Sequence, residues 1–214
     1  MTNSTDVFSS HRIPLRAALQ STLDACEYSY AALLQSQMAI TAHDEDVMLP
    51  GLVCLAIADA VGGEATVARG PAVSLVLLGA MRRVFDGIAS EGASELEREW
   101  GMPRALNAGD GFYALAHSNL IAASGELGAE KRLLALGILD RASHELSLDM
   151  HAGIAPGVSL LSAGAALGGL FAGADLATVS QLGALGSDLQ DGLPDQAREA
   201  LEAAATYLRN RSRR

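Results

Sequence analysis

The sequence contains few aromatic residues and few cysteines, and it lacks the short motifs that mark common enzyme classes. Only 4% of its 214 residues are aromatic, and its two cysteines, Cys26 and Cys54, stand outside any CxxC or Cys/His cluster. This arrangement favours free, buried thiols in a reducing cytosol and gives no sign of a zinc site. No GxSxG elbow, Walker loop or dinucleotide fingerprint is present, so the standard hydrolase and nucleotide-binding classes receive no support.

Basic side chains are fewer than acidic ones. Fifteen Lys and Arg stand against 25 Asp and Glu, which gives a formal net charge of −10. Most of the surface would repel a polyanion, so we expect no nucleic-acid partner. The exception is the C-terminal end, with Arg209, Arg211, Arg213 and Arg214. These arginines either contact a phosphate or a membrane or, as we favour, offset the partial negative charge at the C-terminal end of a terminal helix.

Signals for export or membrane insertion are weak. The first twelve residues contain no apolar segment, which argues against a conventional secretory signal. Residues 152–174 carry no Asp, Glu, Lys or Arg and are long enough to span a bilayer, but Pro156 and several Gly and Ser residues dilute their hydrophobicity. We therefore predict no stable membrane span and a cytoplasmic location.

What the sequence does have is a large share of small and aliphatic residues. Half of the chain is apolar and rich in Ala and Leu, which are strong helix formers. The apolar run 52–58 taken alone is compatible with a strand, but no hairpin signal or sustained alternation accompanies it. Proline near helix starts and glycine near helix ends divide the chain into segments. We predict a single all-α domain over 1–214, flexible over 1–11, with helices near 12–40, 47–61, 71–90, 103–124, 129–151, 156–173, 175–189 and 194–210 and a short one near 93–99.

Four segments resemble, in the correct order, segments of the trans-prenyl diphosphate synthase family. They are residues 49–63 (LPGLVCLAIADAVGG), 100–116 (WGMPRALNAGDGFYALA), 164–174 (GAALGGLFAGA) and 193–208, which begins LPDQAREAL. The resemblance implies an isoprenoid (terpenoid) synthase-like helical bundle, shortened on its C-terminal side. It also implies pairing of subunits through helices that flank an apolar cavity.

In that family, two aspartate-rich helices hold Mg²⁺, which binds an allylic diphosphate. Clustered carboxylates serve this chemistry because Mg²⁺ takes hard oxygen ligands. The resemblance places the first motif, DDxxD, on residues 86–90, which read DGIAS, so Asp86 is the one carboxylate that remains. One interpretation is a displaced metal site formed by Asp86 and Ser90 with Glu91 and Glu95. The interpretation that we favour is an acidic helix end exposed to solvent. We predict no metal cofactor.

The other diphosphate-binding parts are also changed. Acidic residues 44–46 replace the cations that precede Pro50 in relatives, and the family's Lys-Thr pair falls on Pro156 and Gly157. The second aspartate motif is expected after Leu189, yet the chain runs on as QDGLP. We therefore interpret the chain as a degenerate family member that does not carry out ordinary chain elongation.

The richest polar cluster lies within residues 143–151, on a helix that lines the cavity in relatives. Glu145 and Asp149 share one helical face, and His144 beside them is a candidate partner for general acid-base catalysis. His144 and His151 are two turns apart, about 10 Å along the axis, which is too far for one metal without a further ligand between them. The alternative, which we favour, is a polar surface or a hydrogen-bonded network.

Several other residues are candidates for contact with a ligand in the cavity. Asp110 matches the Gly-Asp position of the family, where a structural role is favoured, and a lone histidine such as His117 is more often structural. The full set of candidate cavity residues is Phe85, Asp86, Ser90, Asp110, His117 and His151.

Two functions remain open from the sequence. The first is a non-catalytic homologue that is either an accessory subunit of a prenyl synthase or a binder of an apolar isoprenoid-like ligand. Such a chain is expected to form either a homodimer or a heterodimer with a full-length prenyl synthase. The second is an enzyme that works without metal or diphosphate, such as an acid-base cyclase or isomerase in the apolar cavity, with His144, Glu145 and Asp149 at its centre.

Overall fold

The protein is all-α over the part of the chain that the computed structural model describes, which is residues 8–26, 32, 34, 35, 38, 44–89, 95–152, 158–188 and 206. These residues contain eight α-helices, two short 3₁₀ turns and no strand, so the predicted fold class is confirmed. The helices are α1 (Ser9–Asp24), α3 (Glu45–Ala60), α4 (Arg69–Ala89), α5 (Glu95–Trp100), α6 (Met102–Ala123), α7 (Ala129–Ala152), α8 (Val158–Phe171) and α9 (Leu176–Asp188).

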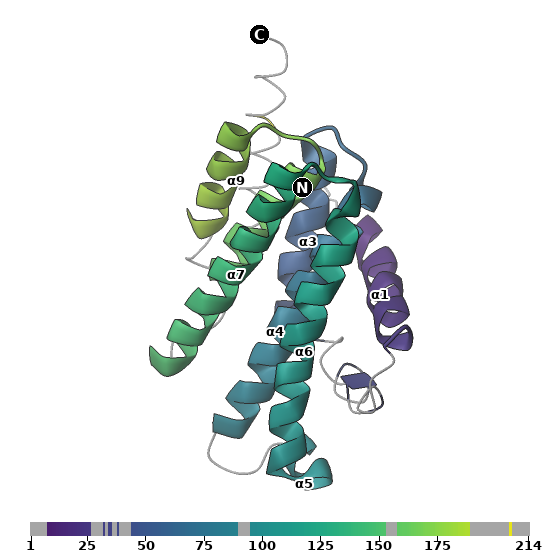
Figure 1. Cartoon of the computed structure of the whole chain (residues 1–214), viewed down its shortest axis with the longest axis vertical. Helices are drawn as coiled ribbons and strands as arrows, with labels where there is room; N and C mark the ends of the chain where they lie inside the picture. Colours follow the sequence, from purple (N-terminus) through teal and green to yellow (C-terminus); the bar gives the residue numbers. More distant parts are fainter. Residues whose placement is uncertain are drawn as a thin grey trace, which may run out of the picture.

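The long helices form a bundle around α3. Figure 1 shows α3, α4, α6 and α7 side by side along the long axis, with α1 and α9 on opposite sides and α5 at one end. Every residue from 51 to 58 is buried, because α3 packs between α4 and α8. This segment is the apolar run that is compatible with a strand when taken alone, and here it is helical.

Glycines let the central helices approach closely. A Cβ atom at Gly164 or Gly168 of α8 would lie 2.6 Å from the carbonyl oxygen of Pro50 or 2.3 Å from that of Cys54, both on α3. A Cβ atom at Gly51 would lie 2.8 Å from the carbonyl oxygen of Ala72 on α4. Backbone therefore packs directly on backbone at these contacts. Small residues are needed there because no space remains between the helices for large side chains.

The N-terminal helix differs from the prediction at both ends. We expected one helix over 12–40, but α1 ends at Asp24, where the amide of Cys26 bonds to the carbonyl of Leu23 and tightens the last turn. The helix begins at Ser9, and Phe8 before it is buried. Residues 9–11, which lie in the segment that we expected to be flexible, form the start of α1. The predicted helix 194–210 lies outside the described residues except for Thr206, which is helical.

The other helix starts follow the sequence signals more closely. Pro103 lies in the first turn of α6, and Gly101 before it has φ +80°, a backbone conformation that favours glycine. Across the described ranges, no helix combines the length and apolar character needed to cross a bilayer. In the uncharged stretch 152–174, α8 has only 14 residues, about 21 Å of helix against a hydrocarbon core of about 30 Å.

Candidate functional site

Asp86 lies near the end of α4, and its carboxylate is held by an arginine of the same helix. Nε of Arg82, one turn earlier, lies 2.7 Å from both carboxylate oxygens. Arg82 is only 5% exposed, and its Nη1 also donates to the carbonyl of Leu146 on α7 at 3.4 Å. The pair therefore links α4 to α7. Arg82 was not among the residues predicted from the sequence, although its i, i+4 spacing to Asp86 is typical of an ion pair within one helix.

The acidic residues before Pro50 also have a structural partner. Asp44 caps α3 by accepting a hydrogen bond from the amide of Asp46 at 3.1 Å, and it pairs with Arg83 of α4 at 3.2 Å. Ser90 and Glu91 lie outside the described residues. Within the residues that are described, no three His, Cys, Asp or Glu side chains come together as a group able to hold a metal ion.

Phe85 and Asp110 lie where α4 and α6 cross. Phe85 is half-buried, and its ring packs so closely on α6 that a Cβ atom at Gly109 would lie 2.5 Å from the ring carbon Cζ. Asp110, the next residue, is exposed. The Gly-Asp pair of the resemblance thus combines a glycine that admits the Phe85 ring with an aspartate on the surface.

His117 and Asn119 follow on the same helix and have different surroundings. Nδ1 of His117 lies 3.0 Å from the carbonyl of Tyr113, so this nitrogen carries the proton and donates it. Asn119 donates to the carbonyl of Gly70 at 2.7 Å and to the hydroxyl of Ser74 at 2.9 Å. Asn119 also accepts from Thr22 of α1 at 3.4 Å, so it joins α1, α4 and α6.

The polar cluster on α7 does not converge on one point. His144, Glu145 and His151 are exposed, and Asp149 is half-buried. Glu145 alone among them lines a groove, and no described hydrogen bond or ion pair connects it with His144 or Asp149.

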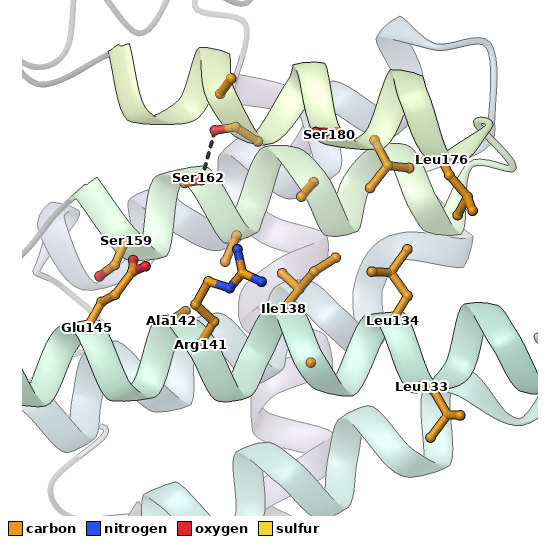
Figure 2. Close-up of a pocket in the computed structure, with 16 residues that line it drawn as sticks. Leu133, Leu134, Ile138, Arg141, Ala142, Glu145, Ser159, Ser162, Leu176 and Ser180 are labelled. Atoms are coloured by element: carbon orange, nitrogen blue, oxygen red, sulfur yellow. Dashed lines mark hydrogen bonds between the residues drawn. The ribbon is translucent and has the colours of Figure 1, made fainter.

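The groove runs between α7, α8 and α9 and has a volume of about 640 Å³. Leu134 and Ile138 of α7, Ala166 of α8, and Leu176 and Val179 of α9 form much of its wall. Figure 2 shows these side chains between the three helices, with Leu134 and Leu176 toward one end and Glu145 and Ser159 at the other. Its volume is that of a small-molecule site.

The polar end of the groove contains a hydroxyl without a partner. Ser159 is 4% exposed, and its Oγ forms no hydrogen bond with any described residue. Glu145 extends from α7 toward it, and Arg141 lies one turn earlier (Figure 2). Ser162 differs, since its hydroxyl donates to the carbonyl of Gly183 on α9 at 2.8 Å. In the sequence, the polar end of the groove is marked only by Ser159 and Ser162, which lie three residues apart within an apolar helix.

Known structures share this arrangement of helices. Neither a protein-family model nor a curated protein sequence matches the chain. Geranyl diphosphate synthase small subunit from Antirrhinum majus matches with a TM-score of 0.72 and 14% identity, over 94% of this chain and 92% of that one. A chain of the heterotetrameric geranyl pyrophosphate synthase of mint matches with a TM-score of 0.70 and 15% identity, again over 94% and 92%.

Longer synthases match over a smaller share of their length. Geranylgeranyl pyrophosphate synthetase from Pyrococcus horikoshii Ot3 has a TM-score of 0.67 and 22% identity, and the match covers 86% of this chain and 62% of that one. The chain thus spans about three fifths of the length of such a synthase. Identities this low support a shared fold, and the shared fold is that of the isoprenoid synthases.

Proposed function

We propose that this chain is a non-catalytic partner of a prenyl diphosphate synthase in isoprenoid metabolism and performs no Mg²⁺-dependent chain elongation of its own. The observation that carries the proposal is the pairing of Asp86 with Arg82, which engages both oxygens of the carboxylate at the expected metal position. Mg²⁺ requires free oxygen ligands, usually from more than one group. A carboxylate already bound by a buried arginine is a poor ligand for it.

A partner surface is available on α6. Met102, Leu106, Tyr113 and Ile121 are large apolar residues with exposures between 38% and 54%. Their spacing of four, seven and eight residues places them on one face of the helix. α6 lies at the front of the bundle, with α3 and α4 behind it (Figure 1). A row of exposed apolar side chains on one helix is typical of a protein-protein contact.

The comparisons support the same proposal. The small subunit from Antirrhinum majus and the chain from the mint heterotetramer are each matched over 92% of their length, whereas three geranylgeranyl pyrophosphate synthases are matched over 61% to 87% of theirs. Those two structures carry the names of a subunit and of a hetero-oligomer. By analogy, we propose a full-length prenyl synthase as the partner of this chain.

The proposal is tested by mixing the purified chain with each trans-prenyl diphosphate synthase encoded in the same genome. We expect a complex in size-exclusion chromatography with light scattering, and a change in the rate or product length of that synthase. The double variant Leu106→Glu/Ile121→Glu should lose the complex, because it places two charges on the apolar face of α6. Ile13→Glu is the control, since Ile13 is an apolar residue on α1 that is even more exposed, at 77%.

A chain that forms no complex with any of these synthases and leaves all their products unchanged would overturn the proposal. An equal loss of the complex in Ile13→Glu would show that α6 is not the contact surface.

A further inference from the structure

The groove between α7, α8 and α9 ends in a buried polar group that lacks a partner. Buried hydroxyls in folded proteins are normally hydrogen-bonded, because water no longer satisfies them. Oγ of Ser159 has no such bond in the described part of the chain, although Ser162 of the same helix does. The hydroxyl of Ser159 is therefore placed at the end of the groove to bond with a donor or acceptor that the described residues do not supply.

The remainder of the groove suits a long apolar chain. Leu134 and Ile138 of α7 lie opposite Leu176 of α9 (Figure 2), and Val179 lines the same groove. The small residues Ala163, Ala166 and Gly183 also line it. Leu134 and Glu145 are eleven residues apart on α7, which corresponds to about 16 Å along the helix. This length accommodates roughly a dozen carbon atoms, given a bond length of about 1.5 Å.

The charges at the polar end disfavour an anionic head group. Arg141 and Glu145 lie one turn apart on α7 and both line the groove, so their charges offset each other. A phosphate or diphosphate next to Glu145 would be repelled, with Arg141 as the one cation among the lining residues. A neutral hydroxyl can donate to the Glu145 carboxylate and accept from Ser159 at the same time.

We propose that this groove binds a long-chain alcohol, with its hydroxyl at Ser159 and Glu145 and its chain along Leu134, Ile138 and Val179. All the lining residues belong to α7, α8 and α9, whereas the proposed partner surface lies on α6. The alcohol site is therefore separate from the proposed partner role, and the isolated chain is sufficient to test it.

The first test compares ligands of equal chain length. The purified full chain is titrated in a calorimeter with 1-dodecanol below its solubility limit and with dodecylamine, dodecanoate and dodecyl phosphate below their micelle concentrations. We expect saturable binding of one dodecanol per chain, at least about tenfold tighter than the binding of the two anions. Equal or tighter binding of either anion or of the amine would overturn the head-group assignment. An absence of saturable dodecanol binding would overturn the site.

Variants locate the binding in the groove. Ser159→Ala should weaken dodecanol binding about two- to tenfold, the share of one neutral hydrogen bond. Its fold should be unaffected, because Ser159 forms no bond with described residues in the free chain. Glu145→Gln should reduce the discrimination against dodecanoate, since the like charge is removed.

Two further variants complete the test. Ser180→Ala is the matched control, because Ser180 lines the groove on α9, away from Ser159 (Figure 2), and it should bind dodecanol normally. Ala184→Trp should fill the groove from the exposed side of α9 and abolish binding. Unchanged binding in Ala184→Trp, or an equal loss in the two serine variants, would contradict a site in this groove.

Discussion

The hydrogen atom of Gly168 occupies a place where a methyl group does not fit. The carbonyl oxygen of Cys54 on α3 would lie 2.3 Å from its Cβ. Gly168→Ala is therefore expected to push α8 from α3 and lower the free energy of unfolding by about 1–3 kcal/mol. Urea unfolding followed by circular dichroism measures this change.

Gly137 provides the control for that substitution. It lies inside α7, and nothing lies within 4 Å of the position of its Cβ. Gly137→Ala should raise the free energy of unfolding by about 0.5–1 kcal/mol, because alanine restricts the unfolded chain and favours the helix. Shifts of the same sign in the two variants would refute the close contact of α3 and α8.

The two cysteines should differ sharply in reactivity. Burial raises the pKa of the Cys54 thiol, whereas Cys26 is half-buried near the end of α1. The thiolate is the reactive form, so Cys54 stays protonated at about pH 8 while an ordinary thiol begins to ionise. We expect an aromatic disulfide reagent to modify one thiol per native chain and both thiols in concentrated urea. Rapid modification of both in the native protein would show that α3 is not buried as described.

The same pKa shift has a consequence for stability. The folded state keeps the Cys54 proton at a pH where the unfolded chain has begun to release it. This thiol therefore does not affect stability well below the ordinary thiol pKa, and the free energy of unfolding falls as the pH rises above about 9. Comparison with Cys54→Ala, in which this part of the pH dependence should disappear, isolates the effect.

At the scale of the helices, Asn119 is the main polar link among three elements. It bonds to Gly70 and Ser74 of the α4 region and accepts from Thr22 of α1. Asn119→Ala should lower the free energy of unfolding by about 1–3 kcal/mol, because it leaves these buried groups with fewer partners. Hydrogen exchange should become faster in α1.

Asn107 gives the comparison on the same helix. It is exposed, so Asn107→Ala should change stability by less than about 0.5 kcal/mol. Equal effects of the two substitutions would mean that the link between α1, α4 and α6 has no role in stability.

Helix positions were predictable where proline or glycine marks an end. Pro71 and Pro103 placed α4 and α6 to within two residues at their starts. The end of α1 at Asp24 was not predictable, because no glycine or proline follows it and the sequence continues with apolar residues. A helix end without a local sequence signal cannot be located from the pattern of residues alone.

The face that each helix turns toward its neighbours was harder to predict than the helix itself. The sequence grouped His144, Glu145 and Asp149, but the way α7 packs on α8 and α9 brings only Glu145 into the groove. Phe85 was a candidate for ligand contact, yet its ring lies on Gly109 of α6. These outcomes depend on the rotation of each helix, which a pattern of residues along one chain does not fix.

At the scale of the whole molecule, the chain has the fold of the isoprenoid synthases, and we propose that it does not have their activity. Backbone contacts at Gly51, Gly164 and Gly168 hold α3, α4 and α8 close together. Arg82 and Asp86 connect α4 with α7 by a charged pair, at the place where the relatives are expected to bind Mg²⁺. This pair links two helices of the bundle, and it is the observation on which the proposed role as a partner rests.

The most direct test is the incorporation of labelled isopentenyl diphosphate into longer prenyl chains, with an allylic diphosphate and Mg²⁺. We expect that the purified chain alone gives no product above a protein-free control, and that its addition changes the rate or product length of a full-length synthase from the same genome. Elongation by the chain alone, in proportion to its concentration and abolished by Asp86→Asn, would contradict the proposed non-catalytic role.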